Sequence, residues 1–225
     1  MTRLRTLPAL TMALALAGAG LAPAPTAVAA LPGLAADRTV KVDVDGDGRK
    51  DTVRITNPKS ERYRVSVTTA KGRKASITLT STIENDWGQE PYWGAAKIDQ
   101  VKGYELLLAT GGGDGYTTAV LTWRKNKLVR QAAPKDRSSK YAWYALSYLD
   151  WGRGGYRFYT KKGKRYVEQY LLLTMGTPRW EGRIVTSRWT SSGWSKTKAK
   201  NVKLTGKQVA KYPGGFHGVK VVAKP

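Results

Sequence analysis

Four aspartates within nine residues have the types and the spacing of a calcium-binding loop. They occupy positions 1, 3, 5 and 9 of residues 43–51, and Gly48 stands at position 6, where such a loop turns sharply. Calcium takes about six to eight oxygen ligands in flexible geometry, and position 7 can add its backbone carbonyl. An acidic turn without metal is the alternative, but its crowded carboxylates would repel one another. We therefore predict one bound Ca²⁺, with ligands from Asp43, Asp45, Asp47, Arg49 (carbonyl) and Asp51.

A second group of acids lies among aromatic residues. Glu84, Asp86 and Glu90 stand close to Trp87 and Trp93. Glycoside hydrolases use two carboxylates on either side of the bond, with aromatic rings that stack on sugars. Acids on a surface connection are more often simply solvated. Because the acids and the aromatic residues of a glycosidase site are both present, a carboxylate-based glycan hydrolase is kept as the alternative function.

Other catalytic mechanisms find few suitable residues in this chain. It has no Cys, and His217 is its only histidine. A Ser-His-Asp triad would have to use His217, and a Cys-His site has no cysteine. A zinc site would usually need further His or Cys ligands. The glycine run that begins at Gly111 precedes a strand pattern rather than a helix, so we interpret it as a β-turn and not as a phosphate-binding loop.

The first thirty residues resemble a secretory leader. Two arginines precede an Ala/Leu-rich stretch at residues 7–21, and residues 27–29 form a small-x-small cleavage motif. That apolar run is interrupted too early to span a bilayer, and no later run is long enough. We predict a signal peptide at residues 1–30 and a secreted domain at residues 31–225, with no transmembrane segment. Since Cys is absent, calcium and a core rich in Trp and Tyr must stabilise the fold.

The charge is strongly positive and unevenly distributed. The formal net charge is +23, and after residue 151 the only acids are Glu168 and Glu181. Such a field attracts polyanions such as cell-wall polymers, acidic polysaccharides or nucleic acid. A charge that serves solubility alone is the alternative. Arg and Lys alternate with Trp180, Trp189 and Trp194, which could stack on a ligand or, alternatively, fill the core.

Strand patterns dominate the chain. Alternating apolar and polar residues, with a turn signal at Lys71-Gly72, predict strands at residues 40–43, 52–56, 62–69, 75–80, 105–110, 117–123, 142–148, 156–160, 166–174, 183–190 and 219–223. One short helix is expected at residues 205–211. An Asp followed by a loop and a strand recurs about every fifty residues, at Asp45, Asp99 and Asp150. Only the first copy keeps its full set of carboxylates.

Residues 42–53 resemble the calcium loop of FG-GAP/VCBS-type repeats, the blade units of integrin-α-like propellers. The resemblance implies antiparallel four-stranded blades with a calcium loop joining two strands. It also implies extracellular adhesion or carbohydrate contact rather than catalysis. Three copies are too few for a closed propeller of about four to eight blades.

The expected fold is all-β, with antiparallel sheets in about three degenerate blade-like repeats and at most one short helix near the C-terminus. These repeats would form a partial propeller or one twisted assembly. The expected function is that of a secreted, calcium-stabilised, non-enzymatic module that binds a polyanionic or carbohydrate partner at the cell surface. The oligomeric state is left open.

Overall fold

The computed structural model describes residues 37–56, 61–82, 91–112, 115–134, 140–145, 151–174, 176 and 178–224. The chain divides into residues Met1–Pro32 and the unit Gly33–Pro225, and all elements below belong to the second. The predicted signal peptide at residues 1–30 lies outside the described residues. In the described part, no helix has the length and the apolar character needed to cross a membrane.

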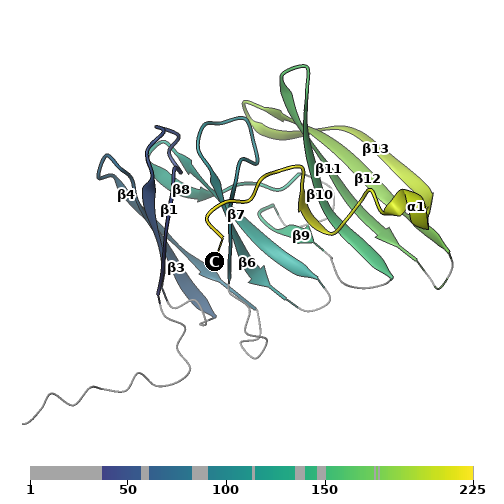
Figure 1. Cartoon of the computed structure of the whole chain (residues 1–225), viewed down its shortest axis with the longest axis horizontal. Helices are drawn as coiled ribbons and strands as arrows, with labels where there is room; N and C mark the ends of the chain where they lie inside the picture. Colours follow the sequence, from purple (N-terminus) through teal and green to yellow (C-terminus); the bar gives the residue numbers. More distant parts are fainter. Residues whose placement is uncertain are drawn as a thin grey trace, which may run out of the picture. The chain divides into compact units, whose positions relative to one another are not determined.

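Three sheets follow one another along the chain (Figure 1). Sheet A has the order β1 (Arg38–Val42), β2 (Asp51–Thr56), β3 (Arg62–Thr68), β4 (Lys74–Thr80). Sheet B has the order β5 (Tyr92–Ala96), β6 (Glu105–Gly111), β7 (Tyr116–Arg124), β8 (Lys127–Arg130), and β9 (Trp143–Ala145) also pairs with β7. Sheet C has the order β13 (Gly193–Thr205), β12 (Arg179–Thr190), β11 (Lys164–Leu173), β10 (Gly152–Lys161), β14 (Gly215–His217). The helix α1 (Gly206–Val209) follows β13.

The predicted all-β fold with antiparallel sheets is confirmed. Each sheet contains four strands paired antiparallel in chain order, and the one parallel pair joins β10 to β14. In β3, Tyr63, Val65 and Val67 are buried while Arg62 and Arg64 are exposed, as the alternation predicts. Only one helix, α1, occurs among the described residues.

Several predicted boundaries are wrong. The strands β5, β8, β13 and β14 had no prediction, and residues 219–223 form a single bridge at Val222 rather than a strand. Lysines and small polar residues fill β13, so its sequence lacks the apolar alternation on which the predictions rest. It is nevertheless paired with β12 over its whole length. Of the strand expected at residues 142–148, Trp143–Ala145 is present and residues 146–148 lie outside the described part.

Each sheet packs against the next through an apolar layer. Sheets A and B share a cluster that includes Tyr63, Val65 and Leu106. Sheets B and C share a second cluster, centred on Trp143 and Phe158. A third, smaller cluster lies between sheet C and α1. The three sheets of residues 33–225 therefore form one continuous series of packed layers.

The C-terminal segment connects sheets C and B. As β14 it runs parallel to β10, with Phe216 opposite Tyr156. Beyond β14, Val222 exchanges two backbone hydrogen bonds with Ala95 of sheet B, at 2.8 and 2.9 Å. Figure 1 shows this yellow segment passing from sheet C to sheet B. A Cβ atom on Gly155 would lie 2.4 Å from the carbonyl oxygen of Gly215, so the close approach of β14 requires glycine there.

Candidate functional site

The first loop, residues 43–50, connects β1 to β2 and is organised around the carboxylate of Asp51. Asp51 is the first residue of β2 and is fully buried. Its Oδ2 accepts hydrogen bonds from the backbone N–H of Val44 (2.7 Å) and of Asp45 (3.2 Å), and its Oδ1 accepts one from Ala70 (2.8 Å). A buried ionised group needs such partners because burial removes its hydration. Asp51 therefore fixes the path of the loop.

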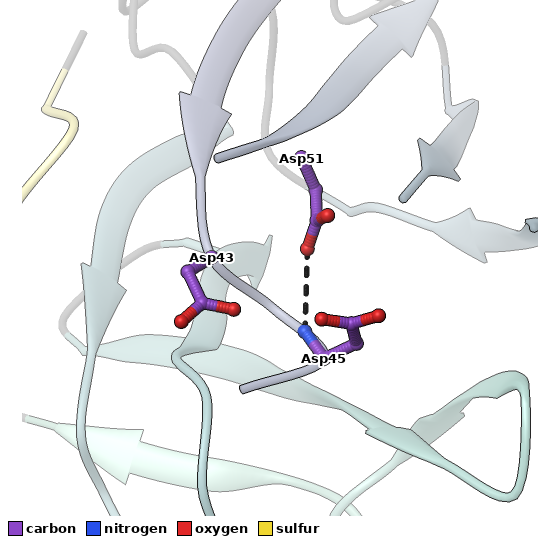
Figure 2. Close-up of side chains that lie close together, drawn as sticks. All are labelled: Asp43, Asp45 and Asp51. Atoms are coloured by element: carbon purple, nitrogen blue, oxygen red, sulfur yellow. Dashed lines mark hydrogen bonds between the residues drawn. The ribbon is translucent and has the colours of Figure 1, made fainter. Parts of the chain in front are cut away.

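Two further carboxylates complete a cluster with Asp51. The Oδ1 of Asp43 accepts from the backbone N–H of Gly46 at 2.7 Å, and the Oδ1 of Asp45 accepts from that of Asp47 at 3.2 Å. One carboxylate oxygen from each of Asp43, Asp45 and Asp51 lies within 4.8 Å of the others. Figure 2 shows these three side chains gathered around the backbone of Asp45. Carboxylate oxygens are the ligands that hard cations such as Ca²⁺ prefer, so this donor set fits the predicted ion.

The other two predicted ligands are placed differently. Asp47 accepts from the guanidinium of Arg49 at 3.2 and 3.3 Å and pairs with Lys71 at 3.3 Å, so its charge is already opposed. Arg49 is exposed, and its backbone N–H also donates to Asp47. The cluster thus contains Asp43, Asp45 and Asp51 but not Asp47, which would have to exchange these partners for a metal ion.

The pKa values of the two central carboxylates of the loop, Asp45 and Asp47, shift in opposite directions. Burial and, after it, the neighbouring carboxylates Asp51, Asp47 and Asp43 raise the pKa of Asp45, against the effect of its backbone hydrogen bond. The hydrogen bond from the backbone of Arg49, and then the side chains of Arg49 and Lys71, lower the pKa of Asp47. A cation among Asp43, Asp45 and Asp51 would remove the repulsion that raises the pKa of Asp45.

The second loop, residues 97–104, repeats this backbone arrangement between β5 and β6. The carboxylate of Glu105 accepts from the N–H of Ile98 at 2.8 Å, seven residues earlier, as Asp51 accepts from Val44. Asp99 accepts from the N–H two residues later, as Asp45 does. The sequence alignment of Asp45 with Asp99, and of Asp51 with Glu105, therefore corresponds to equivalent positions in the structure.

In the second loop an arginine side chain stands between the acids. Arg124, at the end of β7, donates from Nη2 to Asp99 at 2.5 Å and lies 3.7 Å from Glu105. The side chains of both acids are almost completely buried. Burial, and then the charge of Asp99, raise the pKa of Glu105 to about 8, although Arg124 opposes this. Sequence reasoning missed Arg124, because nothing near residue 124 in the sequence marks it as a partner of this loop.

The two loops contact each other directly. The backbone N–H of Tyr104 donates to the carbonyl oxygen of Asp43 at 2.9 Å. Gly46 has φ +76°, and a Cβ atom there would lie 2.5 Å from the Cβ of Lys102. The backbones of the two loops are therefore packed closely together at this point.

The third copy of the repeat has lost the loop chemistry. Asp150 lies outside the described residues, and Tyr156 stands where the alignment places Asp51 and Glu105. The neutral Tyr156 hydroxyl accepts from the backbone N–H of Tyr144 at 2.8 Å, twelve residues earlier and within β9, and not from an N–H seven residues earlier as the two carboxylates do. The place beside β10 that corresponds to β1 and β5 is taken by β14, which runs in the opposite direction to those strands.

Sheet C carries most of the positive charge on one face. Residues directly opposite each other in neighbouring strands lie on the same face. One row across the sheet runs His217, Arg157, Glu168, Thr186, Lys198, and the next runs Tyr159, Tyr166, Arg188. We call this surface the open face and define it as Arg157, Tyr159, Lys161, Lys164, Tyr166, Glu168, Thr186, Arg188, Lys198, Lys200 and His217.

The helix α1 covers only the neighbouring part of this face. Val209 packs with Tyr170, Ile184 and Trp180, which lie toward the other end of the strands. The open face therefore remains half-buried to exposed. Tyr159 and Tyr166 stack on it with ring centroids 5.4 Å apart and an interplanar angle of 8°.

The structure decides between the two roles left open for the tryptophans near the cations, and it places most of them in the core. Trp180 and Trp194 are buried in the apolar clusters, and Trp189 packs against one of them. Lys203 lies on the opposite face of sheet C from Lys198 and Lys200 by strand alternation, and Lys196 does so because a bulge in β13 separates it from Lys198. On the open face, the aromatic residues in the rows of cations are Tyr159 and Tyr166, while Trp180 lies under the guanidinium of Arg153 at 5.3 Å.

The remaining sequence candidates are the acidic group near Trp87 and the glycine run at Gly111. Glu84, Asp86 and Glu90 lie outside the described residues. The strand β7 follows the glycine run at Gly111, so the helix that a nucleotide-binding loop needs is not there, as predicted. Comparisons of this chain with protein-family models, with curated proteins and with solved structures found no match to a family, a relative or a structural neighbour.

Proposed function

We propose that this protein is a secreted, calcium-stabilised β-repeat module that binds a polyanionic partner at the cell surface and catalyses no reaction. The observation that carries the proposal is the open face of sheet C, where cations outnumber acids and surround two stacked tyrosines. The resemblance of residues 42–53 to FG-GAP/VCBS-type loops supports an extracellular role. The leader-like residues 1–30 support export.

The pairing of the acids supports polyanion binding. From residue 152 onward, Glu168 pairs with Arg157 at 2.5 Å and Glu181 pairs with Lys203 at 3.0 Å. No ion pair of Lys161, Lys164, Arg188 or Lys198 occurs within the part of the chain that the structure describes. Their charge is thus available to an external anion.

Protection of the sheet edge is the competing explanation for some of this charge. β13 is an edge strand, and lysines on edge strands discourage pairing with other chains. That explanation covers Lys198 and Lys200 on β13. It does not cover Arg188, which lies inside the sheet on β12, nor the tyrosine pair beside it.

Calcium would have a structural role in this proposal. Bound by Asp43, Asp45 and Asp51, the ion would join the end of β1 to the start of β2 and neutralise the cluster. The chain's own residues hold the loop in place through the bonds that Asp51 accepts. The ion would not take part in partner binding, because the cluster belongs to sheet A and the open face to sheet C.

A hydrolase is the second function considered. One pocket, of about 330 Å³, is lined by Asp99 together with Lys97 and Arg165. Glu105, whose raised pKa would suit a general acid, lies behind Asp99 and does not line this pocket. A two-carboxylate mechanism needs both groups beside the bond, so this site offers little support for hydrolysis.

Salt-dependent binding to a sulfated polysaccharide tests the proposal. We expect the Lys161→Gln, Lys164→Gln, Lys198→Gln variant to elute from heparin resin at lower salt than the wild type. Each lost ionic contact lowers the slope of log K against log salt by about one. The matched control removes three exposed lysines from sheets A and B, Lys74, Lys125 and Lys127. Equal losses in the two variants would show that net charge, and not the open face, determines retention.

A further inference from the structure

A pocket at the edge of the open face has the residues of an oxyanion site. It has a volume of about 560 Å³ and is lined by Arg157, Tyr159, Lys211 and His217, together with Pro213 and Gly218. No carboxylate is found among the described residues that line it. Arg157 and Lys211 are cationic and the Tyr159 hydroxyl can donate, so the chemistry of the pocket favours a negatively charged group, while Nε2 of His217 bonds the carbonyl oxygen of Gly214 at 2.9 Å.

The register of the strands explains why these residues meet. His217 of β14 lies directly opposite Arg157 of β10, and Tyr159 is two residues further along the same face. Lys211 comes from the segment between α1 and β14, which passes over sheet C. Arg157 and Tyr159 belong to β10 and His217 to β14, all in sheet C, whereas the calcium loop joins two strands of sheet A and none of its residues lines the pocket.

The segment that carries Lys211 is held in a fixed position. The Tyr170 hydroxyl donates to the carbonyl of Pro213. The ring of Tyr212 contacts the ring of Tyr170 edge-on at 5.2 Å, and the guanidinium of Arg157 lies 5.1 Å from its centre. A preorganised site loses less conformational entropy when it binds a ligand.

The charges in the pocket are unequally available. Arg157 uses Nε and Nη2 to bind Glu168, at 3.1 and 2.5 Å, so much of its charge is already opposed. Lys211 has no ion pair with any described residue. Burial, and then Glu168, raise the pKa of Tyr159, so its hydroxyl stays protonated and can donate. Lys211 is therefore the main unopposed cation of this pocket.

We propose, resting on the polyanion-binding function above, that this pocket binds a sulfate or phosphate ester group of an acidic polysaccharide whose chain continues across the open face. Arg157 and Tyr159 belong to both surfaces, so one polymer can contact both. Nucleic acid fits less well, because single-stranded binding relies on exposed rings for stacking. Here Tyr159 and Tyr166 stack on each other, and Trp180 and Trp194 are buried.

Affinity for a heparin-type hexasaccharide, measured by titration calorimetry, tests this site. We expect Lys211→Gln to weaken binding by about tenfold, as the loss of a charge-assisted hydrogen bond does. The matched control is Lys207→Gln, four residues earlier on α1, also exposed and outside the pocket. Its affinity should stay within about twofold of the wild type. A desulfated hexasaccharide should lose most of its affinity for all three proteins.

The outcomes separate this inference from the proposed function. Lys211→Gln and Lys207→Gln could weaken binding equally while heparin retention still depends on Lys161, Lys164 and Lys198. That result would refute the binding site in the pocket and leave the proposed function intact. If neither heparin nor the hexasaccharide binds to the protein, both the proposed function and the assignment of the pocket are refuted. Chemical shift changes at Lys211 and His217 with inorganic sulfate would then mark a site for a free anion. Tighter binding of single-stranded DNA than of the hexasaccharide, again dependent on Lys211, would overturn the assignment to a polysaccharide.

Discussion

In the loop before β2, the buried carboxylate of Asp51 accepts the backbone N–H of Val44 and stands beside Asp43 and Asp45, with no cationic side chain within that cluster. In the loop before β6, Glu105 accepts the corresponding N–H, but Arg124 lies between it and Asp99. The two loops share their backbone hydrogen bonds and differ in the source of positive charge.

In both loops, a backbone N–H beyond the end of the preceding strand needs a hydrogen-bond acceptor. A buried carboxylate that accepts from it must itself be neutralised or protonated. In the second loop, Arg124 meets that need for Asp99 from within the chain, and Glu105 keeps its proton up to a raised pKa. For Asp51 the proposed calcium ion meets it from outside. In the third copy, Tyr156 accepts without any charge, so no cation is needed there.

At a fixed neutral pH, removal of the internal cation should have the largest effect of the changes proposed. We predict that Arg124→Met lowers the free energy of unfolding by about 3 kcal/mol, because it leaves two buried acids without their partner. The matched change in the first loop is Arg49→Met, whose side chain is 57% exposed and should contribute less than about 0.5 kcal/mol. Urea unfolding measures both. Similar losses for the two variants would contradict the contrast between the loops.

Calcium should stabilise the protein through the first loop alone. At a hundredfold excess over its Kd, one ion adds about 2.7 kcal/mol, which corresponds to a rise in Tm of about 5–10 °C. We expect Asp45→Asn to abolish this rise and Asp37→Asn, outside the loop, to keep it. Calorimetric titration should give one ion per chain, since the second loop already contains Arg124. A Tm that is the same in calcium and in EDTA would refute the metal site, and two ions would refute the role given to Arg124.

The second loop should also make stability depend on pH. Folded Glu105 keeps its proton up to a pKa of about 8, whereas an unfolded glutamate releases it near about 4.3. Between these values the folded state binds more protons, so the free energy of unfolding falls by about 1.4 kcal/mol per pH unit as pH rises, and levels off above pH 8. The raised pKa of Asp99 acts in the same direction. Glu105→Gln should flatten the profile at fixed calcium, and Glu61→Gln, at an exposed position, should leave it unchanged. If the free energy of unfolding of the wild type does not change between pH 5 and 8, Glu105 does not hold its proton in the way proposed for the second loop.

The smallest effect is expected at Asp47. Its partners are the side chains of Arg49 and Lys71, so Asp47→Asn should leave the urea midpoint without calcium nearly unchanged. If the ion binds to the cluster as it stands, calcium affinity should fall less in this variant than in Asp45→Asn. A loss as large as that of Asp45→Asn would mean that Asp47 turns toward the ion, as the sequence pattern predicts.

Much of the fold could be predicted from local sequence. The alternation in β3 and the position of the loop before β2 are encoded within a few residues each. The edge strand β13 could not be predicted, because its lysines give no apolar pattern and only its pairing with β12 makes it a strand. The roles of Trp180 and Trp194 could not be decided either, since a tryptophan beside cations can lie in a core or on a surface.

The sequence by itself determined the all-β class, the carboxylates of the first loop and the excess of positive charge. Only the tertiary structure decided that Arg124 enters the second loop, that β14 takes the place beside β10, and that Lys198 shares a face with Arg157 while Lys203 does not. The physical reason lies in the range of the interactions involved. Turns and side-chain alternation depend on neighbours in the chain, whereas strand register and the burial of charges depend on which distant segments pack together.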